Sequence, residues 1–215
     1  MNKGLIVTLT LLSLIIIPSI SAISAEKKTS KTFQPHKSQI ELLEQSAIEK
    51  LENDGNAAEQ SAVLDSLGGE WNFNLKYWSK EGADPQESTG TIVNEMVLDK
   101  RFLSGTLSAI LNIGGQNIHL NGMLYTGYDT AKKAYTSVWM DSLHTGMIIG
   151  TGQYDSKKHI LEEKGNFTFP LLDKERRFRS VLEITDDKTH KILIYISGKD
   201  GKEYKAIEID FSRKQ

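Results

Sequence analysis

Four residues on one predicted strand have side chains that could do chemistry. In residues 127–142, which read GYDTAKKAYTSVWMDS, strand alternation places Tyr135, Ser137, Trp139 and Asp141 on one face. If that face points inward, burial beside Trp139 would raise the pKa of Asp141 and make its carboxylate a proton acceptor or ligand anchor. We expect the inward arrangement; the outward one would leave an exposed aromatic strip with a solvated carboxylate.

An inward aspartate is more often a structural partner than a catalyst, and Arg101 and Arg179 are the candidate partners of Asp141. Asp141, Ser142 and His144 do not predict a Ser-His-Asp triad, because Asp141 and Ser142 face opposite sides of a strand. The sequence also lacks a Gly-x-Ser-x-Gly nucleophile motif. Asp141 alone therefore stays a catalytic candidate, and whether the protein is an enzyme is left open, with a non-catalytic role preferred.

The histidines show no metal-binding spacing. They stand at positions 36, 119, 144, 159 and 190, with no His-x-His or His-Glu-x-x-His and no cysteine in the chain. A site built across strands from His119, His144 and Asp141 stays open. His144 near a barrel mouth could also be an axial ligand of haem, which a Soret shift on haemin titration would test. Otherwise we expect no cofactor.

The elements that must position these residues are predicted to be strands. From residue 69 to 213 the apolar pattern has period two, with turn residues at short intervals, which predicts an all-β antiparallel sandwich or barrel. Residues 127–135 and 153–160 look alike, each with Tyr-Asp, then Thr or Ser, then two lysines. We expect two hairpins with the same turn chemistry, because Asp side chains cap turns.

Two short helices are predicted before the strands. In residues 38–52 the apolar positions recur at spacings of three and four, and residues 57–67 could form a second short helix. We expect the first stripe to pack on the barrel or close one end; a partner-binding helix is the alternative.

The N-terminus predicts export. Residues 1–25 contain Lys3, an apolar stretch, Pro18 and small residues up to Ala25, as in a signal peptide cleaved after Ala22 or Ala25. We therefore expect a periplasmic or secreted protein with no stable membrane span after cleavage. Because the chain has no cysteine, its stability must come from a packed core. The predicted segments are a signal peptide (1–25), a flexible leader (26–37), a helical segment (38–66) and a barrel domain (67–215).

The net charge of −2 predicts no binding to nucleic acid or anionic lipid. The end strands predict how the barrel closes, because neighbouring first and last strands would bring the guanidinium of Arg213 against the indole of Trp71. Gly69-Glu70-Trp71 resembles the opening Gly-x-Trp of lipocalin-like (calycin) barrels, which often pack a late Arg on that Trp.

Several segments resemble the bacterial DUF1579 family in order: LGGEW at 67–71, PQESTGT at 85–91, VLDKRFL at 97–103, residues 127–142, and GKDGKEYKAIEIDFSR at 198–213. The resemblance implies a lipocalin-like barrel of about eight to ten strands and carries over no catalytic residue. One departure is Lys100, where the family usually has Gly; if the turn needs a positive φ, Lys would cost on the order of 1 kcal/mol.

The preferred function is an exported, non-catalytic barrel that binds a small apolar or amphipathic molecule. The expected lining or contact residues are Met123, Tyr125, Tyr128, Tyr135, Trp139, Asp141 and Arg101. One alternative is an envelope enzyme that uses Asp141 for proton transfer, with Tyr128 or Arg101 orienting the substrate. Another is a structural or interaction protein with a solid barrel. The sequence does not predict the ligand or the oligomeric state.

Overall fold

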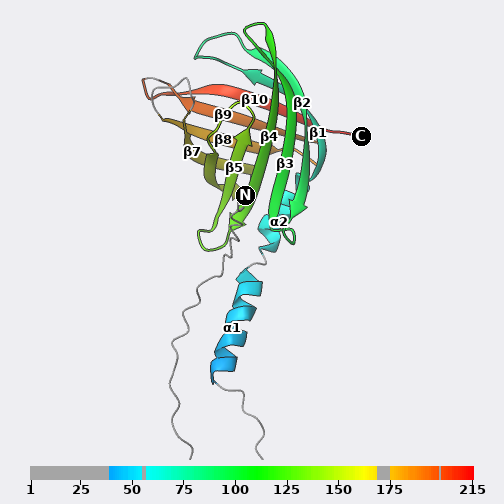
Figure 1. Ribbon diagram of the computed structural model, residues 1–215, viewed down its shortest axis with the longest axis vertical. Coiled ribbons are helices and arrows are strands. Elements are labelled where there is room, and N and C mark those ends of the chain that lie inside the picture. Colours follow the sequence, from blue (N-terminus) through cyan, green and yellow to red (C-terminus); the bar gives the residue numbers. More distant parts are fainter. Residues whose placement is uncertain (1–38, 55–56, 169–174, 199) are drawn as a thin grey trace, which may run out of the picture. The chain divides into compact units, whose positions relative to one another are not determined.

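Ten antiparallel strands form a closed barrel in the computed structural model, which describes residues 39–54, 57–168, 175–198 and 200–215 (Figure 1). Each strand pairs with its neighbours in the chain, and β1 pairs with β10 to close the sheet. The strands are β1 Gly69–Tyr77, β2 Gln86–Val97, β3 Phe102–Ile113, β4 Gln116–Asp129, β5 Ala134–Asp141, β6 Ile148–Asp155, β7 Ile160–Phe167, β8 Arg176–Ile184, β9 Thr189–Ser197 and β10 Glu203–Arg213. The predicted antiparallel, lipocalin-like barrel is confirmed.

Two helices precede the strands, α1 Gln39–Asp54 and α2 Ala58–Ser66, close to the predicted ranges. The apolar side chains Ile40, Leu43 and Ile48 of α1 are exposed. The predicted signal peptide and leader lie outside the described residues. None of the helices in the described ranges is long and apolar enough to cross a membrane.

The two look-alike hairpins do share one turn chemistry. Asp129 accepts hydrogen bonds at Oδ1 from the backbone N–H groups of Ala131 and Lys132, both at 3.0 Å. Asp155 does the same for the second and third residues after it, at 3.0 and 3.2 Å. The residue four positions after each aspartate, Lys133 or His159, has a positive φ of 52° or 56°. The aspartate therefore closes each turn, as the sequence predicts.

The turn between β2 and β3 has an unusual backbone. Leu98, Asp99 and Lys100 have φ values of 51°, 56° and 61°, a left-handed region that non-glycine residues seldom occupy. The suspected positive φ at Lys100 is therefore present. Each such residue costs on the order of 1 kcal/mol relative to glycine, so this turn stores strain.

Helix α2 packs against β2, β3 and β4 and covers one end of the barrel interior. Its Leu64 is 1% exposed and belongs to a buried cluster with Leu103, Tyr135 and Leu161. The hydroxyl of Tyr135 donates a hydrogen bond of 3.2 Å to the carbonyl oxygen of Gln60. Burial raises the pKa of Tyr135 to about 12, so the hydroxyl keeps its proton. We call α2 and the buried cluster beneath it, together with Trp71, His190, Phe211 and Arg213, the closed end.

Arg213 joins the last strand to the first strand and to α2. Its guanidinium carbon lies 4.1 Å from the centre of the Trp71 ring, which is the contact that the sequence predicts. Its Nη1 donates to the carbonyl oxygen of Gly68 at 2.6 Å, and its Nη2 donates to that of Ser66 at 3.1 Å. The cation thus satisfies carbonyl groups at the C-terminus of α2, where a positive charge is favourable.

His190 is enclosed by aromatic rings at the closed end. It stacks on Phe211 at a centroid distance of 4.3 Å and meets the Trp71 ring edge-on at the same distance. Burial, followed by the charge of Arg213, lowers the pKa of His190 from 6.5 to about 4. The imidazole is therefore neutral at physiological pH.

Candidate functional site

The barrel interior contains a cavity of about 1180 Å³. At one end its wall includes Leu64 of α2 and Leu67, the residue that follows this helix. At the other end, the loop end, it includes residues of the loops that join β1 to β2 and β9 to β10. A cavity of this size can hold a drug-sized molecule. A solid barrel, one of the alternatives from the sequence, is therefore excluded.

The cavity wall is mainly apolar. Alternate residues of the strands point inward and supply aliphatic and aromatic side chains such as Phe73, Leu107, Leu120, Phe178 and Ile192. Moving apolar ligand surface out of water into such a space is favourable by roughly 25 cal/mol per Å². The geometry thus suits an apolar molecule with few polar groups.

The inward face predicted for β5 is the one that the structure has. Ser137, Trp139 and Asp141 line the cavity. The Trp139 ring lies so close to β4 that a Cβ atom at Gly122 would come within 2.1 Å of it. Glycine at position 122 is therefore what allows Trp139 to lie across the neighbouring strand.

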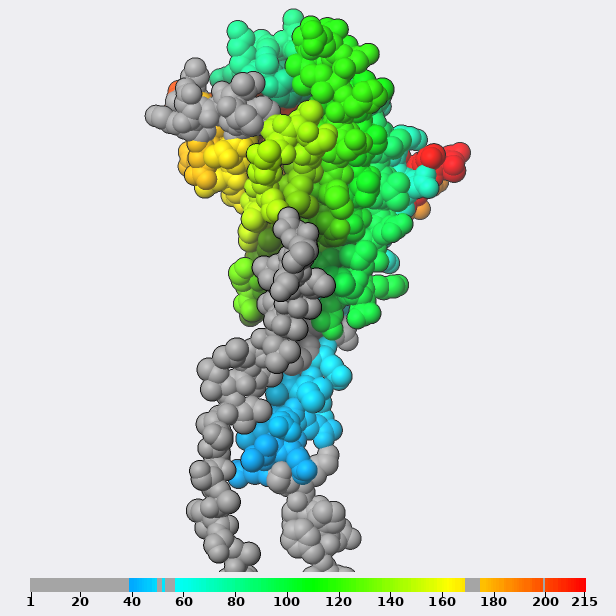
Figure 2. Space-filling model, viewed as in Figure 1, coloured from blue at the N-terminus to red at the C-terminus, as the bar shows by residue number. Residues whose placement is uncertain are grey.

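Met123 and Tyr125 do not line the cavity, contrary to expectation. They are 42% and 36% exposed on the outer surface of β4, a strand that forms part of the green face in Figure 2. The β4–β5 register explains this, since Leu124 pairs with Trp139 and directly opposed residues share a face. Leu124 and Thr126, and not Met123 and Tyr125, point inward on this part of β4.

Four further predicted residues lie elsewhere. Tyr135 is buried at the closed end, and the Tyr128 ring contacts it edge-on at a centroid distance of 5.1 Å. Neither is part of the cavity wall. Arg101 is exposed in the β2–β3 turn, so it neither pairs with Asp141 nor orients a substrate in the cavity. Arg179 lies on the outer face, where its guanidinium is 3.7 Å from Glu162.

Asp141 has an environment opposite to the expected one. Its carboxylate accepts hydrogen bonds of 2.8 Å from Trp139 Nε1 and from the backbone N–H of Leu143, and it pairs with His144 Nδ1 at 2.7 Å. Burial alone would raise the pKa of Asp141, but the hydrogen bonds from His144, Trp139 and Leu143 outweigh it and the pKa is lowered. Asp141 is therefore a fixed anion that orients Trp139 and the β5–β6 loop, and the expected raised pKa is wrong.

His144 lies in the cavity wall beside Asp141. The third member of the suggested cross-strand metal site, His119, is exposed on β4 and does not join them. Within the described ranges, no group of three or more His, Cys, Asp or Glu side chains could hold a metal ion. Haem ligation by His144 stays a prediction for haemin titration.

Sequence reasoning missed Glu163, the carboxyl group in the middle of the wall. Ser137 Oγ donates a hydrogen bond of 2.7 Å to Glu163 Oε1, and Thr126 Oγ1 lies 2.8 Å from Ser137 Oγ. All three residues line the cavity. Burial raises the pKa of Glu163, and the hydrogen bond from Ser137 only partly offsets this.

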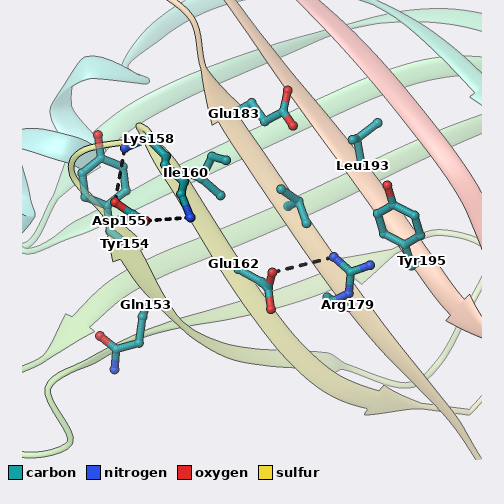
Figure 3. Close-up of a pocket in the computed structure, with 11 residues that line it drawn as sticks. Gln153, Tyr154, Asp155, Lys158, Ile160, Glu162, Arg179, Glu183, Leu193 and Tyr195 are labelled. Carbon is teal, nitrogen blue, oxygen red and sulfur yellow. Dashed lines mark hydrogen bonds and ion pairs between the residues drawn. The ribbon is translucent and has the colours of Figure 1, made fainter. Parts of the chain in front are cut away.

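The adjacent Glu162 shows what Glu163 lacks. It lies on the outer face of β7, where Arg179 Nη1 is 3.7 Å from one of its carboxylate oxygens (Figure 3). Lys164 Nζ lies 2.9 Å from the other oxygen. Glu162 and Arg179 border a shallow outer hollow of about 420 Å³ across β6 to β9. Asp155 and Glu162 there already have cationic partners, and the interior cavity is larger, so we place the candidate site inside the barrel.

Both the sequence and the fold of this chain resemble those of known proteins. A family model described as "Protein of unknown function (DUF1579)" matches residues 56–213. No curated protein matches the chain. The structure is similar to Rv2717c from M. tuberculosis, with a TM-score of 0.53 and 13% identity over 74% of this chain and 99% of that one. It is also similar to the phycobiliprotein lyase CPES from Guillardia theta, with a TM-score of 0.49 and 11% identity over 76% and 97%. At this identity the likeness to Rv2717c shows the barrel fold alone.

Proposed function

This chain belongs to the DUF1579 family, whose description assigns no activity, and we propose that it binds one small apolar or amphipathic molecule inside its barrel. The observation that carries the proposal is the interior cavity of about 1180 Å³ with its largely apolar wall. Covering this apolar wall with the apolar surface of a ligand removes both surfaces from water, which lowers the free energy of the system. The closed end blocks the cavity on one side, so a ligand would enter from the loop end.

The proposed role is binding without catalysis. The enzymatic alternative required a proton-accepting Asp141, but its carboxylate is held as an anion by hydrogen bonds from Trp139, Leu143 and His144. A low pKa makes a carboxylate a weak base, so proton abstraction by Asp141 is disfavoured.

Filling the cavity tests the proposal directly. A Cβ atom at Gly150 would lie 3.4 Å from Glu163 Cβ and 3.4 Å from Phe178, an ordinary contact distance, and Gly150 lines the cavity. The substitution Gly150→Leu should therefore place its side chain in the ligand space. The adjacent Thr151 is exposed on the same strand, so Thr151→Leu is the matched control.

The measurement is a fluorescence titration with the neutral apolar dye Nile red. We expect saturable binding of one dye per chain, weakened about tenfold or more by Gly150→Leu and unchanged by Thr151→Leu. Thermal melts would show that both variants are folded. Equal binding by the two variants would mean that the dye binds outside the barrel, and the proposal would then be abandoned.

We further propose that the protein is exported, on the basis of the signal-peptide pattern in residues 1–25. N-terminal sequencing of the protein from fractionated cells tests this. A mature chain beginning at Ile23 or Glu26 in the periplasm or medium is expected. An unprocessed chain in the cytoplasm would refute export without affecting the binding proposal.

A further inference from the structure

We propose that the ligand is an amphipathic amine, whose ammonium group lies against the carboxylate of Glu163 while its apolar part fills the rest of the barrel. The inference rests on the proposed function, because it names the chemical class that the same cavity would select. Its basis is the contrast between the apolar wall and the polar group around Glu163.

Glu163 has no counter-ion in the part of the chain that the structure describes. The ion pairs there involve its neighbours, such as Glu162 with Lys164 and Arg179, which face outward. The lysine and arginine side chains that line the cavity are Lys80, Arg176 and Lys202. Lys80 lies in the β1–β2 loop, Lys202 lies in the β9–β10 loop, and Arg176 is the first residue of β8, so all three are at the loop end. A carboxylate inside an apolar cavity without a cation is costly, and a cationic ligand would supply the missing charge.

The hydroxyl groups of Ser137 and Thr126 offer a ligand acceptors and not donors. Because Ser137 donates its only hydroxyl hydrogen to Glu163 Oε1, Thr126 must be the donor in the 2.8 Å contact with Ser137. Among the hydrogen bonds of the described residues, none is donated to Glu163 Oε2. Ser180 pairs directly with Glu163 in the sheet and also lines the cavity, so its hydroxyl group is within the same polar region and can accept or donate a hydrogen bond.

This arrangement discriminates between head groups. An ammonium group has three N–H donors and a positive charge, and it matches Glu163 Oε2 and the neighbouring hydroxyl oxygens. A fatty acid or a phosphate ester would place a second negative charge beside Glu163. An alcohol could make one hydrogen bond but would leave the carboxylate without a counter-charge. Burial raises the pKa of Glu163 in the ligand-free protein, as expected for a carboxyl group that lacks a cation.

The position of Glu163 sets the orientation of the ligand. Its partner Ser137 is two residues along β5 from Tyr135 at the closed end and four residues from Asp141, or roughly 7 and 13 Å along the strand. The ammonium group would therefore lie deep in the barrel, and the apolar chain would extend past Trp139 toward the loop end.

The experiment compares three probes with the same alkyl chain: dodecylamine, dodecanol and dodecanoate. Calorimetric titration of the purified protein, below the micelle concentrations, gives the three dissociation constants. We expect dodecylamine to bind about tenfold to a hundredfold more tightly than dodecanol, and dodecanoate to bind most weakly, because hydrogen bonds to charged groups contribute about 1.5–3 kcal/mol.

Glu163→Gln keeps the size and the Ser137 contact but removes the charge, so it should abolish the preference for the amine and leave dodecanol binding within about twofold. Glu162→Gln makes the same substitution one residue away on the outer face and should change none of the three constants. Equal affinities for amine and alcohol in the wild-type protein would overturn the inference, and this comparison does not depend on the folding of any variant. Equal weakening of all three probes by Glu163→Gln would overturn it too, since it would indicate a structural role. Binding without preference for the amine leaves the proposed function intact, whereas no binding of any probe refutes both.

Discussion

The two ends of the barrel interior are built in opposite ways. At the closed end, α2, Trp71, His190 and Arg213 fill the space with stacked rings and hydrogen bonds to backbone carbonyl groups. Above it, the wall around Glu163 and Trp139 encloses an open cavity. This difference indicates that the closed end contributes mainly to stability and the wall around Glu163 mainly to binding. Changes at Arg213 or His190 should therefore lower stability, whereas changes around Glu163 should alter ligand affinity without lowering stability.

The largest effect expected at the closed end comes from His190. The unfolded histidine binds a proton near pH 6.5, whereas the buried one binds it only near pH 4. Between these values the unfolded chain holds more protons, so the free energy of unfolding should fall as the pH is lowered from 6.5 to 4, by on the order of 3 kcal/mol. Urea unfolding across this range would measure it. His190→Phe should remove this part of the pH dependence, while His119→Phe on the exposed face should keep it.

Arg213→Ala should destabilise the protein by about 2 kcal/mol. The variant loses the contact with Trp71 and the hydrogen bonds to the carbonyl oxygens of Gly68 and Ser66. Thermal unfolding measures the loss, and Arg177→Ala, at an exposed position of β8, serves as the control with an effect within about 0.5 kcal/mol. Unchanged stability would mean that Arg213 does not hold the closed end together. A loss of Nile red affinity in the folded variant would contradict the claim that the closed end contributes to stability and not to binding.

A substitution in the wall, unlike one at Arg213, should not destabilise the protein. Glu163→Gln removes a buried charge that has no counter-ion, so it should raise the free energy of unfolding at neutral pH by on the order of 1 kcal/mol. The folded carboxyl group has the higher pKa and so binds its proton at a higher pH than the unfolded one. The gain should therefore shrink as the pH falls and both states become protonated. Chemical denaturation at two pH values would measure this, and a destabilised variant at neutral pH would contradict it.

The smallest expected effect is at the β2–β3 turn. Lys100→Gly should stabilise the protein by up to about 1 kcal/mol, because glycine adopts the φ of 61° without steric cost. Lys132→Gly, in a turn position without a positive φ, should instead be neutral or destabilising. Differential scanning calorimetry can resolve the two changes. A destabilised Lys100→Gly variant would show that the lysine side chain matters more than the backbone strain.

The barrel, its closure and its hairpins could be predicted from the sequence because each depends on a local or terminal pattern. Asp129 and Asp155 specify their turns through atoms two and three residues away. The Trp71 and Arg213 contact follows once the end strands are neighbours. The hairpins need only strand alternation and known turn chemistry. Alternation left a sandwich or a barrel open, and the resemblance to the DUF1579 family implied the barrel.

The sequence could not predict which face of β4 points into the barrel, because apolar residues occupy both of its faces. Met123 and Leu124 are equally suited to the interior by type, and only pairing with β5, where Trp139 lies over Gly122, decides between them. Strand β7 has the same ambiguity, since Ile160-Leu161-Glu162-Glu163 gives each face one apolar and one acidic residue. Glu163 was missed for this reason, and a strand register would have found it.

The pKa of Asp141 was predicted in the wrong direction because its hydrogen-bond donors come from the loop that follows β5. The backbone N–H of Leu143 and the ring of His144 reach the carboxylate only when the chain turns back on itself. Burial could be inferred from strand alternation, but this turn geometry could not.

Native mass spectrometry of the purified protein tests the central claim most directly. After incubation with a small excess of dodecylamine, the account predicts one bound molecule per folded chain, displaced by Nile red and lost in Gly150→Leu but not in Thr151→Leu. A spectrum with only the bare chain, or with a ladder of adducts that is the same in both variants, would contradict a ligand-binding interior.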